Sequence, residues 1–499
     1  LNRPGSKLAE RMDYYIAPLE QETDFLKIGK PEEIKICDPA CGSGHMLTYA
    51  FDLLHAIYEE EGYDPAEIPA LILKYNLSGI EIDERAAALA AFALAMKAAA
   101  KLRRRRFLHL EVKPDIVVLQ NVTFTMAELT DVAAVVGKDL FSSELRDTLT
   151  QFEQAKNFGS LIVPRLRDPE ETLRVVEKRD FGGDLLLKEV QARVVAVLRM
   201  AEALSPKYHL VVANPPYMST RGMNNRLRAG VADQFPESKS DLMTAFMSRT
   251  SELTIRLGFA ALVTLDSWMF LSSFDKLRTI LNRKWPVKSL AHIGWNCFPD
   301  GHAYNRGAAF VCQIGATSSP GTYLRLSDVP ANVSKGELFL KRRQDVRHKF
   351  VRSVEDFKNI PGEPIAYWAS EEILKAFGNY TKLGSIAEPR QGLATADNDR
   401  FLRLWNEVSQ DKIGFDLTSI SDSVVSLRKW FPYNKGGDYR KWFGNNEYVV
   451  NWEKDGLEIR NFTDQDGNVR SRPQNTSYFF KPSLTWTSTS SFYFGIRHS

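Results

Sequence analysis

The sequence predicts an α/β protein with a Rossmann-like, doubly wound and mostly parallel sheet, followed by a mixed α/β domain. Short apolar strands alternate with amphipathic helices along the first part of the chain, which is typical of such a sheet. Polar or glycine-rich segments directly follow several of these strands. After about residue 376, short aromatic strands and turns rich in Gly, Asn, Asp and Pro replace the alternation, which predicts a second domain.

The elements of the sheet region are expected in a regular order along the chain. Apolar residues recur at helical spacing in some segments, and one predicted helix is rich in alanine, the strongest helix former. We expect strands over 33–38, 77–83, 114–121, 208–214, 259–265, 290–296 and 307–315, and helices over 45–60, 84–102 and 273–283. The mostly helical stretch from about 125 to 205 breaks this order and predicts an insertion.

The length and composition predict a folded protein of two domains. The chain has 499 residues, too many for one ordinary domain, and 44% of its residues are hydrophobic. We expect domains over 1–375 and 376–499, the second truncated, because the chain begins with Leu1 and ends in what resembles an unfinished strand. The net charge of +3 implies that any nucleic-acid surface is local and balanced by acidic residues elsewhere.

The spacing of the cysteines and the length of the apolar runs bear on the expected cellular location of the protein. The 4 cysteines show neither paired Cys-X-X-Cys spacing nor a disulfide framework, so we expect a reducing, cytoplasmic location. No apolar run is long enough for a membrane span, and no membrane partner is expected. His45, His209 and His302 lack metal-ligand spacing, so we expect no metal.

The first candidate site is the loop "DPACGSGHM" at 38–46, which follows the first predicted strand. Ligands bind such folds at the carboxyl ends of the strands. Gly42 and Gly44 lack a Cβ and let the backbone approach a ligand closely. Asp38 would repel a pyrophosphate and suits a cationic ligand such as S-adenosylmethionine, which carries an ammonium and a sulfonium. A tight turn without a ligand is the alternative.

Acidic and amide side chains follow the second and third predicted strands. Glu81 stands at the end of the second strand, where an acid can accept hydrogen bonds from both ribose hydroxyls of a nucleoside. Asp83, which leads into the alanine-rich helix, fits the helix N-cap better than Glu81 does. Asn121 ends the third strand and could bind the adenine edge, although an ordinary turn asparagine is equally compatible with the pattern.

The segment "NPPY", residues 214–217, follows the fourth predicted strand. Pro215 and Pro216 fix an extended backbone and remove two amide donors, which leaves the Asn214 side-chain oxygen and the Pro215 carbonyl as rigid acceptors. Two such acceptors suit an amino group and can localise the lone pair of an adenine amine. Tyr217 offers a face on which a base can stack, worth about 1–3 kcal/mol. The segment would hold the amine in line with a sulfonium methyl group; a rigid turn is the alternative.

In this order, "DPACGSG", "GIEID" and "NPPY" resemble the gamma-class amino-methyltransferases that act on adenine in DNA, over about residues 30–315. The resemblance implies catalytic roles for 214–217 and for Phe298, an aromatic residue that would pack against a flipped base. The family's Thr-Pro motif before the first strand is not evident in 1–30. The cofactor residues implied are Asp38, Ala40, Gly42, Gly44, Glu81 and Asn121.

The C-terminal part of the sequence, from residue 392 onward, resembles a narrower group of methyltransferases. The segments "GLATADNDRFLRLW" at 392–405, "KWFPYNKGGDYRKWFGN" at 429–445 and "KPSLTWTSTSSFYFGIR" at 481–497 are similar to the PglX, or BrxX, methyltransferases of BREX phage-defence systems. This resemblance implies that a target-recognition domain begins here. Cations that interleave with aromatic rings predict DNA contacts, and an aromatic mini-core with solvated lysines is the alternative. The DNA-binding residues expected are Lys429, Tyr433, Lys435 and Arg440.

These patterns lead to one functional hypothesis. The protein would be a site-specific methyltransferase that flips an adenine out of double-stranded DNA and methylates its exocyclic amine with S-adenosylmethionine, marking self DNA in phage defence. The resemblance implies other BREX proteins and phage-encoded inhibitors that mimic DNA as partners. The alternatives are the methyltransferase part of a single-chain restriction–modification enzyme, a cofactor-gated DNA-binding sensor with little turnover, and a protein glutamine methyltransferase.

Overall fold

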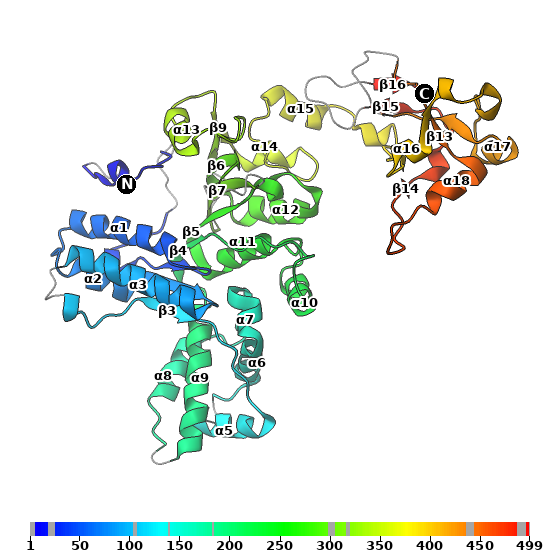
Figure 1. Cartoon of the computed structure of the whole chain (residues 1–499). Coiled ribbons are helices and arrows are strands. Elements are labelled where there is room, and N and C mark those ends of the chain that lie inside the picture. Colours follow the sequence, from blue (N-terminus) through cyan, green and yellow to red (C-terminus); the bar gives the residue numbers. More distant parts are fainter. Residues whose placement is uncertain are drawn as a thin grey trace. The chain divides into compact units, whose positions relative to one another are not determined.

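The structure is a computed structural model of the chain, shown in Figure 1. It describes residues 5–17, 25–102, 107–137, 140–181, 184–297, 305–315, 320–435, 444–486 and 496–498. The chain divides into two compact units, Leu1–Tyr380 and Thr381–Ser499. This division falls close to residue 376, where the composition of the sequence changes.

A nine-stranded sheet lies at the centre of the first unit, counted over the described residues. Its spatial order is β3-β2-β1-β4-β5-β7-β6-β8-β9. β1 to β5 run parallel, whereas β7 is antiparallel to both β5 and β6. The predicted doubly wound, mostly parallel sheet is therefore confirmed. The strands are β1 (Ile36–Asp38), β2 (Leu77–Glu81), β3 (Asp115–Val118), β4 (Tyr208–Ala213), β5 (Thr254–Leu265), β6 (Val287–Trp295), β7 (Arg306–Gln313), β8 (Gly321–Arg325) and β9 (Lys349–Arg352).

Successive strand residues point to opposite faces of the sheet, and each face is covered by helices. Ile36 and Leu77 pack against α1 (His45–Glu60) and α3 (Glu84–Lys101). Cys37, which follows Ile36 in the chain, points to the other face and packs there with α9 (Leu185–Ala203). Apolar side chains on both faces explain why these strands read as apolar runs rather than as alternating patterns.

The predicted helical insertion is present, and its last helix forms part of the core. It contains α5 (Met126–Val136), α6 (Ser143–Gln151), α7 (Ala155–Phe158), α8 (Pro169–Glu177) and α9. Figure 1 shows α8 and α9 lying side by side and extending away from the sheet. The buried residues of the second half of α9, such as Val197 and Leu198, share one apolar cluster with strand residues.

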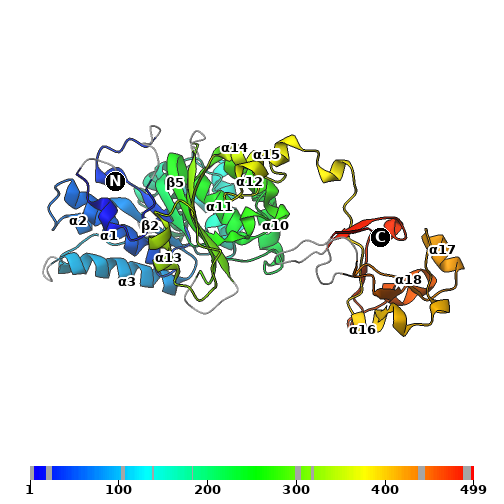
Figure 2. The same cartoon turned by 90° about the horizontal axis from the view of Figure 1, so that it is seen from above.

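Of the remaining helices of the first unit, the first lies between β1 and β2 and the others follow β4 and the later strands; several are visible from above in Figure 2. They are α2 (Ile68–Leu71), α10 (Asn225–Gln234), α11 (Leu242–Leu253), α12 (Asp275–Lys284), α13 (Lys335–Arg342), α14 (Val354–Lys358) and α15 (Glu371–Asn379). Within the described parts of the chain, no helix has both the length and the apolar character needed to cross a membrane.

The second unit is a mixed α/β arrangement of short elements, as predicted. Its sheets pair β10 (Leu393–Ala394) with β14 (Arg472–Pro473), β13 (Tyr448–Asn451) with both β11 (Leu402–Leu404) and β12 (Trp430–Pro432), and β15 (Leu484–Trp486) with β16 (Ile496–His498). Its helices are α16 (Asn398–Phe401), α17 (Ile420–Val425) and α18 (Glu453–Arg460). Its apolar core is largely aromatic, with Phe401, Phe431 and Trp452 buried.

Candidate active site

The loop after β1 and the segment after β4 meet at one edge of the sheet. β1 and β4 are neighbouring parallel strands, with Cys37 opposite Val211. Asp38 and Asn214, which stand at the carboxyl ends of these strands, therefore lie at the same edge. The chain order of the strands reverses between β1 and β4, and open α/β sheets bind ligands at such a switch point. The fold thus brings together the two predicted segments at a position suited to a ligand.

The glycine loop is tied to the end of β2. The backbone N–H of Gly42 donates to Oε2 of Glu81 at 2.8 Å, and Glu81 Oε1 accepts from the N–H groups of Ile82 and Asp83. Gly42 has a φ of +53°, and a Cβ at this position would meet nothing within 4 Å. The predicted cofactor loop and second-strand acid are therefore one connected structure with open space in front of Gly42.

Gly44 has a different role from Gly42. Its φ is +82°, and a Cβ here would lie 3.0 Å from the Cβ of Ala90 on α3. Gly44 also immediately precedes α1. The absence of a side chain at Gly44 therefore allows the loop to pack closely against α3, whereas Gly42 leaves room for a ligand.

Asp38 is a buried carboxylate without a counter-charge among the described residues. It is 2% exposed, and Oδ1 accepts a hydrogen bond from the N–H of Ala40 at 3.1 Å. Burial raises the pKa of Asp38 to about 7; the Ala40 N–H opposes this shift and the charge of Glu81 adds to it. A buried carboxyl of this kind fits a cationic ligand, which would supply the missing charge.

The structure separates the roles of the other acidic and amide residues near this loop. Asp83 caps α3 by accepting from the N–H groups of Arg85 and Ala86, as the sequence predicted. Oδ1 of Asn121 accepts from the backbone N–H of Lys156 at 2.9 Å, which ties the turn after β3 to α7. The role of Asn121 in binding adenine stays a prediction.

The NPPY segment follows β4 directly, with Asn214 and Pro216 exposed and Pro215 buried. The Tyr217 hydroxyl donates to Oδ1 of Asn214 at 2.8 Å and also lies 3.1 Å from the carbonyl oxygen of Val263 on β5. The Tyr217 ring is half-buried and packs partly against the apolar core. Burial, followed by the nearby Cys297 thiol, raises the pKa of Tyr217, so its hydroxyl remains a neutral donor. Base stacking on this ring stays a prediction.

Phe298 lies outside the described residues, but its neighbour Cys297 is placed at the same edge. Cys297 follows β6 closely, and a Cβ on Gly307 would lie 2.6 Å from its Sγ. Burial raises the pKa of Cys297. The clamping role of Phe298 stays a prediction.

Sequence reasoning missed a buried polar network beside this edge. Asp266 follows β5, and its Oδ2 accepts from Nε2 of His292 at 2.8 Å and from Nε of Arg306 at 2.9 Å. Nδ1 of His292 lies 2.9 Å from the hydroxyl of Tyr367. Burial raises the pKa of Asp266, but these hydrogen bonds outweigh it, and the pKa is lowered. A carboxylate directly after a predicted strand was the available signal, the same one that identified Glu81.

In the second unit, part of the aromatic segment forms core. Trp430 and Phe431 are buried, while the Nζ of Lys429 lies 5.9 Å from the centre of the Trp430 ring. The half-buried Tyr433 donates its hydroxyl to the Leu393 carbonyl oxygen at 2.7 Å. This geometry favours the mini-core interpretation for the rings of Trp430 and Phe431. DNA contacts by Lys429, Tyr433 and Lys435 stay predictions, and Arg440 lies outside the described residues.

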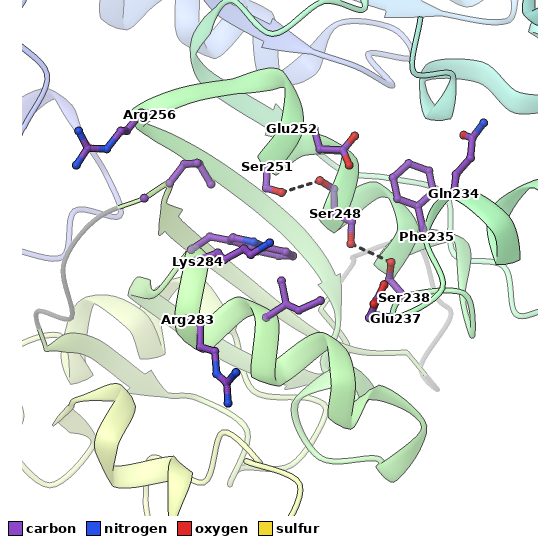
Figure 3. Close-up of a pocket in the computed structure, with 14 residues that line it drawn as sticks. Gln234, Phe235, Glu237, Ser238, Ser248, Ser251, Glu252, Arg256, Arg283 and Lys284 are labelled. Carbon is purple, nitrogen blue, oxygen red and sulfur yellow. Dashed lines mark hydrogen bonds between the residues drawn. The ribbon is translucent and has the colours of Figure 1, made fainter. Parts of the chain in front are cut away.

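A cavity of about 620 Å³ lies elsewhere in the first unit, at the amino end of β5, as Figure 3 shows. Its hydroxyl groups are already engaged: Ser251 donates to the carbonyl oxygen of Ser248, and the hydroxyls of Ser238 and Ser248 bond to each other. In Figure 3, Arg256 and Arg283 point in different directions and do not converge on one point. This cavity lacks the convergent groups of an active site.

Comparison with known proteins agrees with this geometry. Residues 75–298 match the family model described as Eco57I restriction-modification methylase. A solved structure of a DrdV–DNA complex aligns with a TM-score of 0.42 and 14% identity, covering 68% of this chain and 28% of that one. Over residues 75–298, which include Glu81 and the Asn214–Tyr217 segment, the chain is therefore similar to restriction-modification methylases.

Two curated relatives are similar to this chain over most of its length. The chain is 38% identical over 486 residues to the adenine-specific methyltransferase PglX of Lacticaseibacillus casei (strain Zhang), covering 94% of this chain and 39% of that protein. It is 37% identical over 531 residues to the adenine-specific methyltransferase BrxX of Escherichia coli O9:H4 (strain HS), covering 99% and 42%. The chain is thus a homologue of PglX and BrxX along nearly its whole length. It spans about two fifths of the length of these relatives.

Proposed function

We propose that this protein transfers a methyl group from S-adenosylmethionine to the exocyclic amine of adenine in double-stranded DNA. One observation carries the proposal: in a homologue of adenine-specific methyltransferases, the Asn214–Tyr217 segment adjoins the Asp38 and Gly42 loop at the switch point of the sheet. A cation-binding loop and a rigid amine acceptor on neighbouring strands are what an amino-methyltransferase requires.

The cofactor would occupy the loop after β1 and the end of β2. S-adenosylmethionine supplies an activated methyl group on a positively charged sulfur. The buried carboxylate of Asp38 would balance positive charge, and Glu81 would hold the ribose hydroxyls. Gly42 would let the loop backbone approach the cofactor. Ala40, Gly44 and Asn121 complete the proposed set, the first through the N–H that orients Asp38.

The target amine would sit between the cofactor loop and the NPPY segment. Oδ1 of Asn214 has two lone pairs and accepts a hydrogen bond from Tyr217, so one lone pair can accept from the adenine amine. The Pro215 carbonyl would accept its second proton. Held by these acceptors, the amine would receive the methyl group that bound S-adenosylmethionine supplies, and its surplus proton would pass to water. Tyr217 and Phe298 would hold the ring of the flipped base, which offsets the few kcal/mol that unstacking costs.

The same proposal includes a biological setting, which the similarity to PglX and BrxX supports. Methylation would mark self DNA in phage defence, with other BREX proteins as partners and phage-encoded DNA mimics as inhibitors, in the cytoplasm. Long-read sequencing of DNA from cells with and without the protein would reveal modified adenines in one sequence context. Absence of such adenines when all system components are expressed would contradict the proposal.

Asn214→Ala tests the assignment of the amine acceptor. We expect loss of at least about two orders of magnitude in methyl transfer to DNA, because the amine loses its oriented acceptor. Isothermal titration should give unchanged affinity for S-adenosylmethionine. Asn359→Ala removes an exposed amide in the same unit and is the matched control. Normal tritium transfer by Asn214→Ala would exclude the assigned role.

A further inference from the structure

Arg306 stands at the same edge as the NPPY segment but has no part in the methyl-transfer step. It is the first residue of β7, and its neighbour Gly307 pairs with Leu265 at the end of β5. The Tyr217 hydroxyl reaches the carbonyl oxygen of Val263 on the same strand. Arg306 therefore lies at the edge that carries the proposed base pocket, with β5 between its strand and the strand that ends at Asn214.

The Arg306 guanidinium is held in place by two groups. Its Nε donates to Oδ2 of Asp266 at 2.9 Å, and its Cζ lies 5.4 Å from the centre of the Trp295 ring. Asp266 is itself fixed by Nε2 of His292, and both of these side chains are buried. A rigid, buried carboxylate thus orients a cation whose side chain is 40% exposed.

The two contacts described above do not use the terminal nitrogens of Arg306 as hydrogen-bond donors. The hydrogen bond to Asp266 uses Nε, and in the described parts of the chain neither Nη has a partner. An arginine that served only to balance Asp266 would be expected to use two nitrogens in a bidentate pair. The partly exposed Arg306 side chain instead lies against the ring of Trp295, which is itself 38% exposed. Guanidinium groups of this geometry suit the paired oxygens of a phosphate.

We propose that Arg306 binds a phosphodiester group of the DNA strand that carries the target base, and that Asp266, His292 and Trp295 are positioning residues. The inference rests on the proposed function. A flipped nucleotide rotates about its own backbone, so the phosphates next to it must pass close to the base pocket. A fixed cation at that point would set the register of the strand without reading its sequence.

The dependence of DNA affinity on salt tests this proposal. Arg306→Gln removes the charge while keeping a polar side chain of similar reach. We expect weaker binding to every duplex sequence tested, and a slope of log affinity against log salt that is less negative by about 0.9, the value for one lost phosphate contact. Arg306→Lys should keep the slope while lowering affinity, because it retains the charge but not the planar group.

Arg193→Gln is the matched control. Arg193 also pairs with a carboxylate, Glu128, and lies 5.2 Å from the centre of an aromatic ring, Phe124, but it belongs to the helical insertion. We expect its salt slope to equal that of the wild type. Trp295→Leu, which removes the ring but no charge, should lower affinity without changing the slope.

The outcomes separate this inference from the proposed function. If Arg306→Gln keeps the wild-type slope, whether or not its melting temperature falls, Arg306 has a structural role and the inference is wrong, even when the wild type methylates DNA. If the wild type neither binds nor methylates duplex DNA, the proposed function fails and this inference fails with it. A slope changed equally by Arg193→Gln would also overturn the assignment, since the effect would not be specific to this edge.

Discussion

The hydroxyl of Tyr217 donates a hydrogen bond to Oδ1 of Asn214 at 2.8 Å. The bond links the two ends of the NPPY segment and fixes the rotation of the Asn214 amide. Tyr217 therefore contributes an orienting hydroxyl as well as the ring that the sequence suggested. The Tyr217 oxygen also lies 3.1 Å from the carbonyl oxygen of Val263 on β5, a second and more distant acceptor for the same proton.

Tyr217→Phe tests this orienting role. The substitution keeps the ring but frees the Asn214 amide to rotate, so we expect kcat for methyl transfer to fall by about 10- to 100-fold, the range that a small misplacement of a catalytic group costs. The KM for DNA should change much less, because the stacking surface remains. Tritium transfer at saturating cofactor measures the effect. Unchanged kcat would show that the amide is held by other contacts.

The raised pKa of Asp38 predicts pH-dependent binding of S-adenosylmethionine. A cationic ligand favours the carboxylate, and the pKa of Asp38 in the ligand-free loop is about 7. Affinity should therefore rise with pH by up to about tenfold per unit below 7, with release of a proton on binding. Titrations between about pH 5 and about pH 7, in buffers of different ionisation enthalpy, measure both quantities. Asp38→Asn should flatten the profile, and a flat wild-type profile would contradict the prediction.

The same pKa predicts how the stability of the ligand-free protein depends on pH. Between the ordinary value of 3.8 and about 7, the folded protein binds more protons at Asp38 than the unfolded chain does. The contribution of this residue to the free energy of unfolding therefore falls as pH rises across that interval. Chemical denaturation of the wild type and of Asp38→Asn at several pH values isolates this contribution. As pH increases, the free energy of unfolding of the wild type should fall relative to that of Asp38→Asn.

The close approach of Gly44 to α3 predicts a pair of coupled substitutions. Gly44→Ala places a Cβ 3.0 Å from the Cβ of Ala90 at a φ of +82°, so we expect a loss of about 1–3 kcal/mol of stability. Ala90→Gly removes the Cβ contact but leaves the Ala90 Cα at 3.1 Å and the backbone strain. The double variant should therefore lose less than the sum of the two single losses. Denaturant unfolding measures all three, and simple additivity would mean that the two residues do not interact.

Arg249 on α11 links this helix to the insertion, and its replacement tests the strength of that link. Its side chain is 1% exposed and donates to the carbonyl oxygens of Ser160, Ile162 and Leu204 at 2.6–2.9 Å. Arg249→Met should lower the free energy of unfolding by more than about 3 kcal/mol, because buried carbonyl groups lose their donors. Arg199→Met is the control.

Arg199 forms an ion pair with Glu177 at 2.8 Å, with a side chain that is 65% exposed. Its replacement should change the free energy of unfolding by less than about 1 kcal/mol, because exposed ion pairs contribute little. Equal losses for Arg249→Met and Arg199→Met would contradict the linking role of Arg249.

The sheet and much of its edge were predictable because their signals are local. Apolar runs that end in Asp38, Glu81 and Asn214 mark strand ends, and parallel strands place such ends at one edge of a sheet. The position of the helix 45–60 was predicted to the residue, since its apolar spacing is regular and a glycine precedes it. The hydrogen-bond partners of these residues could not be predicted from the sequence. Nothing local indicates that Tyr217 bonds to Asn214 rather than pointing to solvent.

The sequence by itself determined the fold class, the order of the strands along the chain and the chemical character of their ends. Only the tertiary structure joined Asp266 to His292 and Arg306, which lie 26 and 40 residues away along the chain. It also decided that Trp430 and Phe431 are buried. The physical reason is that periodicity and strand ends are properties of neighbouring residues, whereas a buried charge network forms only where strands far apart in sequence are packed side by side.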